Sequence, residues 1–382
     1  MAKPPLVSIP LSSDRNLPPP VFAQSARAAA ASKVVDNILV WDQHAFFVPP
    51  QLWNTKTTPM AAVLPDVDSF SDAFALAAYG GAAAPELGLM VSTDAVRRGP
   101  AEVMQSALTL SAIGGREAVI MMGAGEVKQT KPFGWDRSQG LARLEDHLKL
   151  FHALWDSQDK PLNFDGNVWN MRNAWIGKAR GKRPQIWALG GGPKLLDMAT
   201  SYADGFSTVV PNNAATPEAW NKLVTSMKQA LERKGRDPEA FHFDIWLVSL
   251  VHDDRAVLDR ALDNPIMRWM AACWGRLNQR EWAAEGVEPA FPLDWHYAMK
   301  LLPQEFTDAQ IADVLSKTSR KMAEKTYFHG DAKTIAGIGK SFVDAGATSV
   351  TVSDTLALVL DPQDAQNALA RSLEVCRILK RG

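Results

Sequence analysis

Short apolar segments alternate with longer segments of helical periodicity along almost all of this 382-residue chain. That order is typical of a parallel sheet whose strands are joined by helical crossovers, because each crossover covers a face of the sheet. The apolar segments predict eight strands, over 6–9, 37–41, 86–91, 118–122, 185–189, 205–210, 243–251 and 349–353. The spacing of apolar residues around them predicts helices over 21–32, 69–79, 100–113, 138–155, 194–202, 217–234, 332–345 and 363–379.

Eight such units favour closure into a (β/α)8 barrel, or TIM barrel, over an open doubly wound sheet, which rarely needs so many. We therefore predict a single barrel domain over residues 1–382. The pattern changes at 276–328, where Trp282, Trp295, Tyr297 and three prolines replace the regular alternation. This segment is interpreted as an insertion before the last strand.

The charge balance argues against a polyanionic partner. Forty-one basic and forty-two acidic residues leave a net charge of −1, so no global field attracts nucleic acid or an acidic membrane. Cys273 and Cys376 form no metal-binding or redox motif, and no metal site is expected. Residues 1–20 do not resemble a secretory signal, and no apolar run reaches the roughly 20 residues of a membrane span. We expect a cytoplasmic protein that acts on a small molecule.

In a barrel, the loops after the strands surround one shared mouth, so reactive side chains are expected at strand ends. Asp42-Gln43-His44 follows the second predicted strand. These three side chains can position a ring or exchange a proton near neutral pH, and all three are candidate catalytic residues. The alternative is that Asp42 ties down the following loop and His44 is solvated. Asp42 is also a candidate cofactor ligand.

Two further strand ends carry candidate residues. Ser92-Thr93-Asp94 follows the third strand, and its hydroxyls can bond to a heterocycle or serve as ordinary turn and cap groups. Gly123-Ala124-Gly125-Glu126 follows the fourth strand, where small residues let a flat ligand approach the backbone. Glu126 is the candidate proton donor, although a glycine turn with a solvated Glu126 would have the same sequence.

A glycine run after the fifth strand suits an anion. Gly190-Gly191-Gly192-Pro193 opens a helix, and unblocked backbone N–H groups at a helix N-terminus can bind phosphate. The spacing matches neither a GxGxxG fingerprint nor a P-loop, and a plain tight turn is the alternative. Val209, near the end of the sixth strand, completes the predicted cofactor-binding set of Asp42, Ser92, Thr93, Gly123, Ala124, Gly125, Gly190, Gly191, Gly192 and Val209.

Together these strand ends resemble the luciferase-like superfamily, and within it the deazaflavin-dependent (F420-dependent) reductases of actinobacteria. The resemblance extends through nearly the whole chain. It is carried by Gly123-Ala124-Gly125-Glu126, by Pro184-Gln185-Ile186-Trp187 with Gly191-Gly192-Pro193, and by Tyr202-Ala203-Asp204-Gly205-Phe206. Gly286-Val287-Glu288-Pro289 and Leu302-Pro303-Gln304 resemble the mycobacterial phthiodiolone ketoreductase branch.

The resemblance implies that coenzyme F420, or FMN in other branches, lies across the barrel mouth with its phosphate in the glycine turn. It implies that Glu126 exchanges a proton beside the cofactor. It also implies that Ser92 and Thr93 back the ring, where the family often has a non-proline cis peptide. One departure from the family comes directly after Asp42. Relatives commonly have His immediately after this Asp, whereas here Gln43 intervenes and His44 comes one place later.

The function that the resemblance implies is an F420-dependent hydride transfer that reduces a C=O, C=N or activated C=C bond in an apolar substrate. An FMN-dependent monooxygenase and a flavin- or deazaflavin-binding protein without turnover are the alternatives. Relatives often dimerise, so a homodimer is left open.

Overall fold

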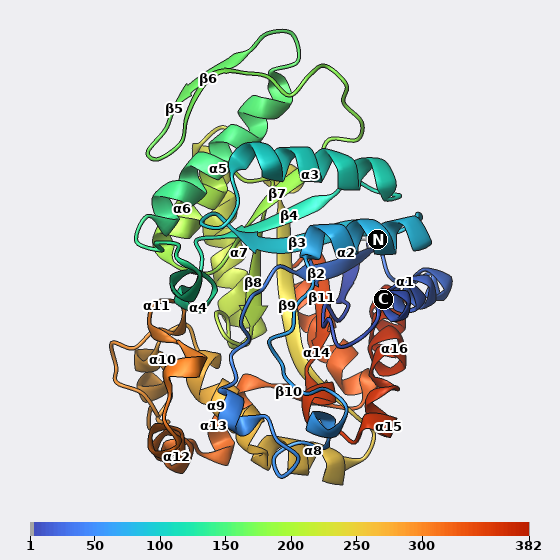
Figure 1. Ribbon diagram of the computed structural model, residues 1–382, viewed down its shortest axis with the longest axis vertical. Helices are drawn as coiled ribbons and strands as arrows, with labels where there is room; N and C mark the ends of the chain where they lie inside the picture. Colours follow the sequence, from blue (N-terminus) through green and yellow to red (C-terminus); the bar gives the residue numbers. More distant parts are fainter. Residues whose placement is uncertain (1–3, 382) are drawn as a thin grey trace.

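Eight parallel strands close into a ring at the centre of the computed structural model, which describes residues 4–381 (Figure 1). Each strand pairs in parallel with its neighbour, and the last strand pairs with the first. A short strand, β10 (Phe328–Gly330), pairs with the end of β9 outside the ring. The ring consists of β1 (Leu6–Pro10), β2 (Asn37–Trp41), β3 (Gly88–Asp94), β4 (Val119–Gly123), β7 (Gln185–Leu189), β8 (Gly205–Val210), β9 (His242–Val251) and β11 (Ser349–Asp354). The predicted (β/α)8 barrel is confirmed.

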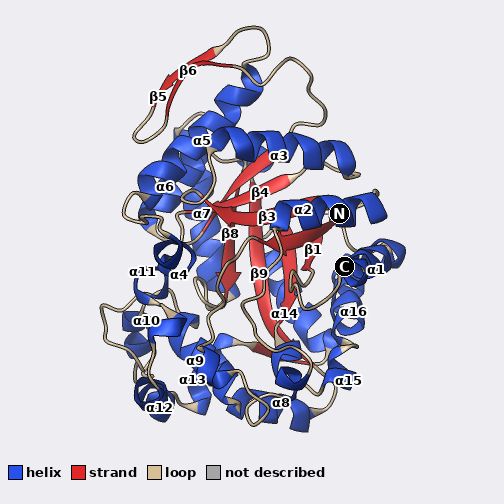
Figure 2. Cartoon of the chain, viewed as in Figure 1, coloured by secondary structure: helices blue, strands red, loops and turns tan. Residues whose placement is uncertain are grey.

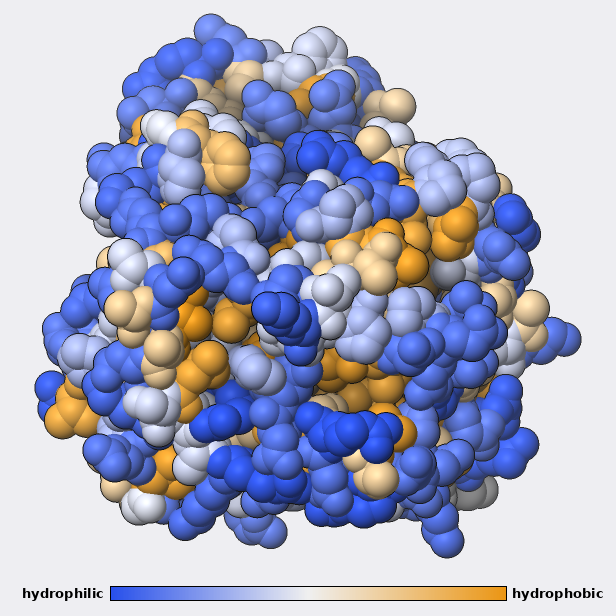
Figure 3. Space-filling model, turned by 60° about the horizontal axis from the view of Figure 1, so that its bottom comes forward, coloured by the Kyte–Doolittle hydropathy of each residue, from blue (hydrophilic) through white to orange (hydrophobic). Residues whose placement is uncertain are grey.

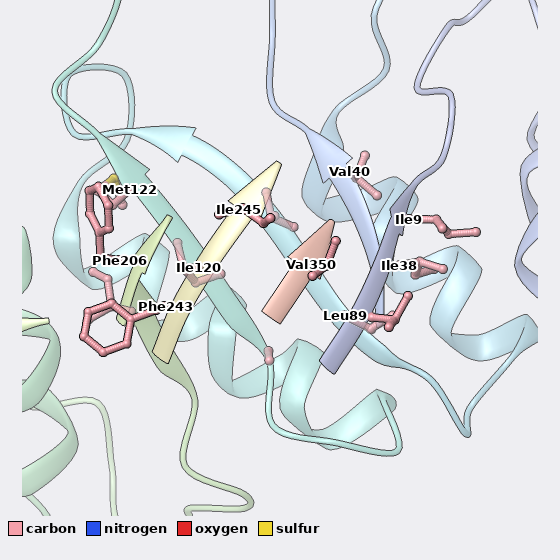
Figure 4. Packing of buried hydrophobic residues seen from close by; sticks show 14 of the residues in the cluster. Ile9, Ile38, Val40, Leu89, Ile120, Met122, Phe206, Phe243, Ile245 and Val350 are labelled. Carbon is pink, nitrogen blue, oxygen red and sulfur yellow. The ribbon is translucent and has the colours of Figure 1, made fainter. Parts of the chain in front are cut away.

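Both faces of these strands are buried, which explains why they stand out as continuous apolar runs. Ile38, Leu89 and Ile120 are among the residues that face the surrounding helices (Figure 4). Their sequence neighbours Leu39, Met90, Met121 and others form a separate apolar cluster inside the ring with Trp187. The alternation assigns each residue of the rim to the inside or to the outside of the barrel.

Helices surround the ring of strands (Figure 2). Pro is the first or second residue of α1, α3, α6 and α7. An N–H at these positions has no partner within the helix, so proline, which lacks this group, is well tolerated there. The crossover helices are α1 (Pro19–Ser32), α2 (Ala73–Ala83), α3 (Pro100–Ile113), α5 (Gly140–Asp156), α6 (Pro193–Tyr202), α7 (Pro217–Arg233), α14 (Ala332–Asp344) and α16 (Ala368–Lys380).

Several boundaries differ from the prediction. Helix α2 begins four residues later than expected, because Asp72 caps it by accepting a hydrogen bond from the Ala75 N–H. It continues through Gly80, where a Cβ would approach a Phe22 ring carbon to 2.4 Å, so close packing requires glycine inside the helix. The predicted helix over 363–379 is divided into α15 (Pro362–Ala365) and α16. Strand β3 extends to Asp94, so the hydroxyl segment lies in the strand and not after it.

An antiparallel hairpin between α5 and β7 was not predicted. Strands β5 (Leu162–Asp165) and β6 (Asn170–Ala174) extend from the barrel at the top of Figure 1. The buried carboxylate of Asp146 on α5 holds the hairpin turn by accepting backbone N–H groups of residues 167, 168 and 169. The Asp165-Gly166 pair is a recognisable hairpin-turn signal that the helix-and-strand alternation obscured.

Six helices lie between β9 and α14 and form an apolar cluster of their own around Trp269 and Trp282. Phe46 and Trp53, from the long loop after β2, belong to the same cluster. The extent of the insertion, 276–328, stays a prediction, and the structure adds two helices before it. The six are α8 (Arg255–Asp263), α9 (Pro265–Trp274), α10 (Gln279–Ala284), α11 (Tyr297–Lys300), α12 (Asp308–Lys317) and α13 (Arg320–Thr326).

Over residues 4–381, no helix is both long and apolar enough to cross a membrane. The same residues contain no group of His, Cys, Asp or Glu side chains that could hold a metal ion. Cys273 and Cys376 are both buried and free.

Candidate active site

Two tryptophans form the floor of the barrel mouth. Trp41, the last residue of β2, and Trp246 of β9 stack inside the ring with centroids 6.3 Å apart and planes 16° apart. Ser92 lies beside Trp41 in the sheet register, and Val209 lies beside Trp246. Ser92 and Val209 therefore share the inner face with this floor, as expected for residues that contact a ligand in the mouth.

Glycines lie at and just after the ends of β4 and β7, where other parts of the chain approach their backbone closely. Gly123 ends β4, and Gly125 has φ +87°, a conformation that favours glycine. Gly190 has φ +148°, and a Cβ on Gly191 would approach the Asn213 side chain to 2.5 Å. A Cβ on Gly192 would meet open space, and no side chain in residues 4–381 caps the N-terminus of α6. Free N–H groups at such a terminus suit a phosphate.

Asp42 and Thr93 lie on the other side of the strands. Thr93 pairs in register with Met122, which belongs to the outer apolar core, and the Thr93 hydroxyl donates to Asp42 at 2.6 Å. Arg98 donates to the same carboxylate at 2.8 Å, and an Arg97 nitrogen lies 3.5 Å from it. The Asp42 side chain is 4% exposed. The structure thus separates Asp42 and Thr93 from Ser92, although all three were predicted to contact one ring.

The partners of Asp42 control its charge. Burial alone would raise the pKa of Asp42, but the Arg98 hydrogen bond, the charges of Arg97 and Arg98, and the Thr93 hydrogen bond together lower it. Asp42 is therefore held as a carboxylate at neutral pH.

The expected non-proline cis peptide is not present in β3. In the part of the chain that the structure describes, the cis bond is Val210–Pro211, at the end of β8. The cis peptide that relatives often have in this segment is therefore not found here.

Gln43 and His44 point to different surroundings. The Gln43 Oε1 atom is buried, as is Trp41 Nε1, and neither has a hydrogen-bond partner among residues 4–381. His44 is exposed and stacks on Trp135, with ring centroids 5.9 Å apart. Burial of part of the ring, and then the charge of Arg97, lower the pKa of His44. Gln43, and not His44, brings an unsatisfied polar atom to the end of β2.

Glu126 forms an ion pair that the sequence did not indicate. It immediately precedes the short helix α4 (Val127–Thr130), and its carboxylate lies 2.7 Å from Lys128 Nζ. The Lys128 side chain is 0% exposed, and the Glu126 side chain is 27% exposed. Lys128 Nζ also donates to the Ala45 carbonyl at 2.9 Å and lies 4.0 Å from the centroid of the Phe47 ring. A lysine two residues after a loop glutamate is normally a solvated residue, so no sequence pattern identifies it.

Helix α11 brings aromatic groups from the insertion to this ion pair. Helices α11 and α4 lie side by side (Figure 1). The Tyr297 ring of α11 lies 5.9 Å from that of Phe47, and Phe47 lies 6.0 Å from Trp274. Burial, and then the charge of Glu126, raise the pKa of Tyr297, so its phenol stays protonated. The Glu126 carboxylate therefore follows the glycine-containing turn of residues 123–125 and lies close enough to Tyr297 for its charge to act on the phenol.

The match to a protein family is consistent with this arrangement. Residues 53–348 match the family described as luciferase-like monooxygenase, which is most of the chain. The protein belongs to this family.

Its curated relatives include ketoreductases. The chain is 31% identical over 245 residues to the phthiodiolone/phenolphthiodiolone dimycocerosates ketoreductase of Mycobacterium sp. (strain JLS), an alignment that covers 63% of each protein and so less than two thirds of that relative's length. It is 26% identical over 365 residues to the Mycobacterium kansasii protein of the same name, covering 94% of this chain and 97% of the relative.

Solved structures share the fold. An F420-dependent secondary alcohol dehydrogenase in complex with an F420-acetone adduct superposes with a TM-score of 0.72 at 19% identity, covering 99% of both chains. The long-chain alkane monooxygenase LadA superposes with a TM-score of 0.67 at 11% identity, covering 100% of this chain and 92% of that one.

Proposed function

We propose that the protein is an F420-dependent oxidoreductase that reduces a C=O, C=N or activated C=C bond in an apolar substrate. The observation that carries the proposal is the partly exposed Glu126 carboxylate at the end of the glycine turn, paired with Lys128, whose ammonium lies over the Phe47 ring. The ketoreductase relatives support the same reaction class, and the family match supports an oxidoreductase more broadly.

The residues of the mouth suit a flat tricyclic ring with an anionic tail. The Trp41–Trp246 floor offers an apolar surface for the ring, and Trp41 Nε1 and Gln43 Oε1 offer buried polar atoms that lack partners in the described chain. Gly123–Gly125 allows close approach of the ring edge, and Gly190–Gly192 offers backbone N–H groups to the phosphate. When bound, reduced F420 supplies a hydride.

Glu126 is proposed to deliver the proton that the product needs. Reduction of a carbonyl places negative charge on its oxygen, and an acid within hydrogen-bond reach lowers the barrier to that step. Glu126 is 27% exposed, so a substrate atom can reach it, whereas Asp42 is enclosed by arginines. The catalytic assignments of Asp42, Gln43 and His44 stay predictions.

Phe47, Trp274 and Tyr297 next to the ion pair supply apolar surface for the rest of the substrate. Figure 3, which brings the insertion end of the molecule forward, shows apolar patches among the hydrophilic surface there. A hydrocarbon chain or ring fits this wall better than a phosphorylated sugar. A cytoplasmic location and a homodimer stay predictions.

The proposal is tested by titrating the apo-protein with F420 and with FMN, and then assaying the reduction of apolar ketones with reduced F420. We expect F420 to bind at least about tenfold tighter, a difference of about 1.4 kcal/mol. Tighter binding of FMN with oxygen consumption would instead identify a monooxygenase. Tight cofactor binding without turnover of any acceptor would identify a binding protein.

A further inference from the structure

Lys128 is a buried ammonium in contact with the proposed proton donor. Its Nζ has three neighbours: the Glu126 carboxylate at 2.7 Å, the Ala45 carbonyl at 2.9 Å and the face of Phe47 at 4.0 Å. Its side chain has no exposed surface. An ammonium in such a place has lost its hydration, and that loss must be offset by these contacts.

The loop that Lys128 touches is already held by its neighbour Gln129. Gln129 Nε2 donates to the Ala45 carbonyl at 2.7 Å, and Gln129 Oε1 accepts the backbone N–H groups of His44 and Ala45 at 2.6 and 3.2 Å. Both backbone groups of residue 45 therefore have a partner without Lys128. Fixing the loop does not by itself require a charge at position 128.

The groups around the pair determine which of its two partners gives up a proton. Burial lowers the pKa of Lys128, opposed by the Glu126 charge and hydrogen bond, and the net shift is downward. The other charged or titratable groups that face Lys128 or Glu126 are Arg97, Asp68, Arg137, His296 and Tyr297. Of these, Arg97 opposes the charge on Lys128 and Asp68 favours it.

We infer that Lys128 is a positioning residue that acts through Glu126, as the proton reservoir from which Glu126 is protonated during the reaction. The inference rests on the proposed function. It assigns the single transferable proton of the Glu126–Lys128 pair to Nζ in the resting state.

The proton balance for a carbonyl substrate is as follows. The carbonyl carbon gains a C–H bond with the two electrons of the hydride, and its oxygen takes a proton from the Glu126 carboxyl group. Glu126 takes that proton from Lys128 Nζ, across the 2.7 Å contact, and Lys128 becomes a neutral amine. Solvent reprotonates the pair after the alcohol leaves. In alcohol oxidation each transfer runs in the opposite direction.

A reservoir and a purely structural lysine respond differently to substitution. Lys128→Met removes the charge and keeps an apolar side chain of similar length, whereas Lys128→Arg keeps the charge on a guanidinium that does not release its proton below pH 12. Lys131→Met is the matched control, because Lys131 lies three residues further on and its side chain is 65% exposed.

The first measurement is kcat against pH with reduced F420, alongside F420 affinity by fluorescence titration. We expect both position-128 variants to lower kcat by at least about tenfold, with F420 affinity within about threefold of wild type. Wild type should lose kcat at alkaline pH as the pair gives up its proton, and Lys128→Arg should lack that limb. Full rescue of kcat and of the pH profile by Arg would overturn the inference.

The second measurement needs no turnover. The pKa of Lys128 is lower in the folded protein than in the unfolded chain, where it is about 10.4. At a pH between these two values, the unfolded chain binds a proton that the folded protein has released. The free energy of unfolding therefore rises with pH in this range. The melting temperature of wild-type apo-protein relative to Lys128→Arg should therefore increase with pH in the alkaline range below about pH 10. A constant difference would show that Lys128 keeps its proton and would overturn the inference. Failure of the wild type to bind F420 or to reduce any ketone would refute the proposed function instead.

Discussion

Two carboxylates at the barrel rim, those of Asp42 and Glu126, have contrasting surroundings. Asp42, after β2, has a 4% exposed side chain and is bound by Thr93 and Arg98, with Arg97 also in ion-pair range. Glu126, after β4, is partly exposed and forms an ion pair with one buried lysine in the described chain. A carboxylate enclosed by guanidinium groups is locked in its charged form, because those groups do not give up protons.

The sequence suggested proton exchange for both residues, and their surroundings now distinguish them. Asp42 ties the strand end to the Arg97–Arg98 segment and fixes the geometry of the rim. Glu126 is partly exposed and pairs with an ammonium group, an arrangement that its proposed role as general acid requires. Each of the following substitutions tests one side of this comparison.

Glu126→Gln should have the largest effect. The amide keeps the shape of the side chain but has no acidic proton, so kcat should fall by about 10² to 10⁴-fold while F420 affinity stays within about threefold. Steady-state kinetics and fluorescence titration measure the two quantities. Unchanged turnover would remove Glu126 from the reaction and with it the proposed contrast to Asp42.

Asp42→Asn should lower the stability of the folded protein. Removing the charge leaves Arg97 and Arg98 without their shared carboxylate at a buried site, and we expect the free energy of unfolding to fall by about 3 kcal/mol. Urea denaturation measures it. Asp165→Asn, which breaks the exposed Arg172 pair of the hairpin, is the control and should change stability by less than about 0.5 kcal/mol. Equal losses in the two variants would contradict the assignment of Asp42 as an anchor.

Gly191→Ala should weaken cofactor binding. Its Cβ would approach the Asn213 side chain to 2.5 Å, so the anion-binding turn must shift, and we expect F420 affinity to fall about tenfold. Gly181→Ala, where a Cβ would meet open space, is the control. Unchanged affinity in Gly191→Ala would place the phosphate elsewhere.

The contribution of Asp42 to the free energy of unfolding should be lost only at strongly acid pH. Because the pKa of Asp42 is lowered in the folded protein, its stabilisation is complete above the unfolded value of about 3.9 and is lost as pH falls through the folded value. The stability difference between wild type and Asp42→Asn should therefore be constant from about pH 7 to 5 and shrink below about pH 4. A difference that already shrinks at pH 6 would indicate another titrating group.

His44→Ala should have the smallest effect. The ring is exposed and contacts Phe133 and Trp135 at the rim, so stability should change by less than about 0.5 kcal/mol and kcat/KM by about twofold or less. A hundredfold loss of kcat would instead make His44 the proton donor and leave Glu126 without that role.

Most of the fold was predictable because parallel strands buried on both faces leave a strong apolar signal. All eight barrel strands were located, whereas the predicted helix over 69–79 stopped short of Gly80 and Gly81, because glycine inside a helix is explained only by what packs against it. The hairpin of β5 and β6 was missed because it lies outside the barrel repeat and its short strands are only partly buried, so they carry no strong apolar pattern.

The candidate site was predictable only in part. Strand ends were the right places to search, but whether a residue faces the mouth depends on where the strand stops. Strand β3 runs three residues further than expected, so Ser92 and Thr93 lie on opposite faces. A shift of one position along a strand reverses the side chain.

By itself, the amino-acid sequence determined the barrel, the glycine-rich rim and the candidate acid Glu126, since these depend on local patterns of apolar and small residues. Only the tertiary structure decided that Asp42 is enclosed by arginines and that a buried Lys128 lies against Glu126. The physical reason is that a charge acquires its role from the groups that replace its water, and those groups come from segments distant in the chain.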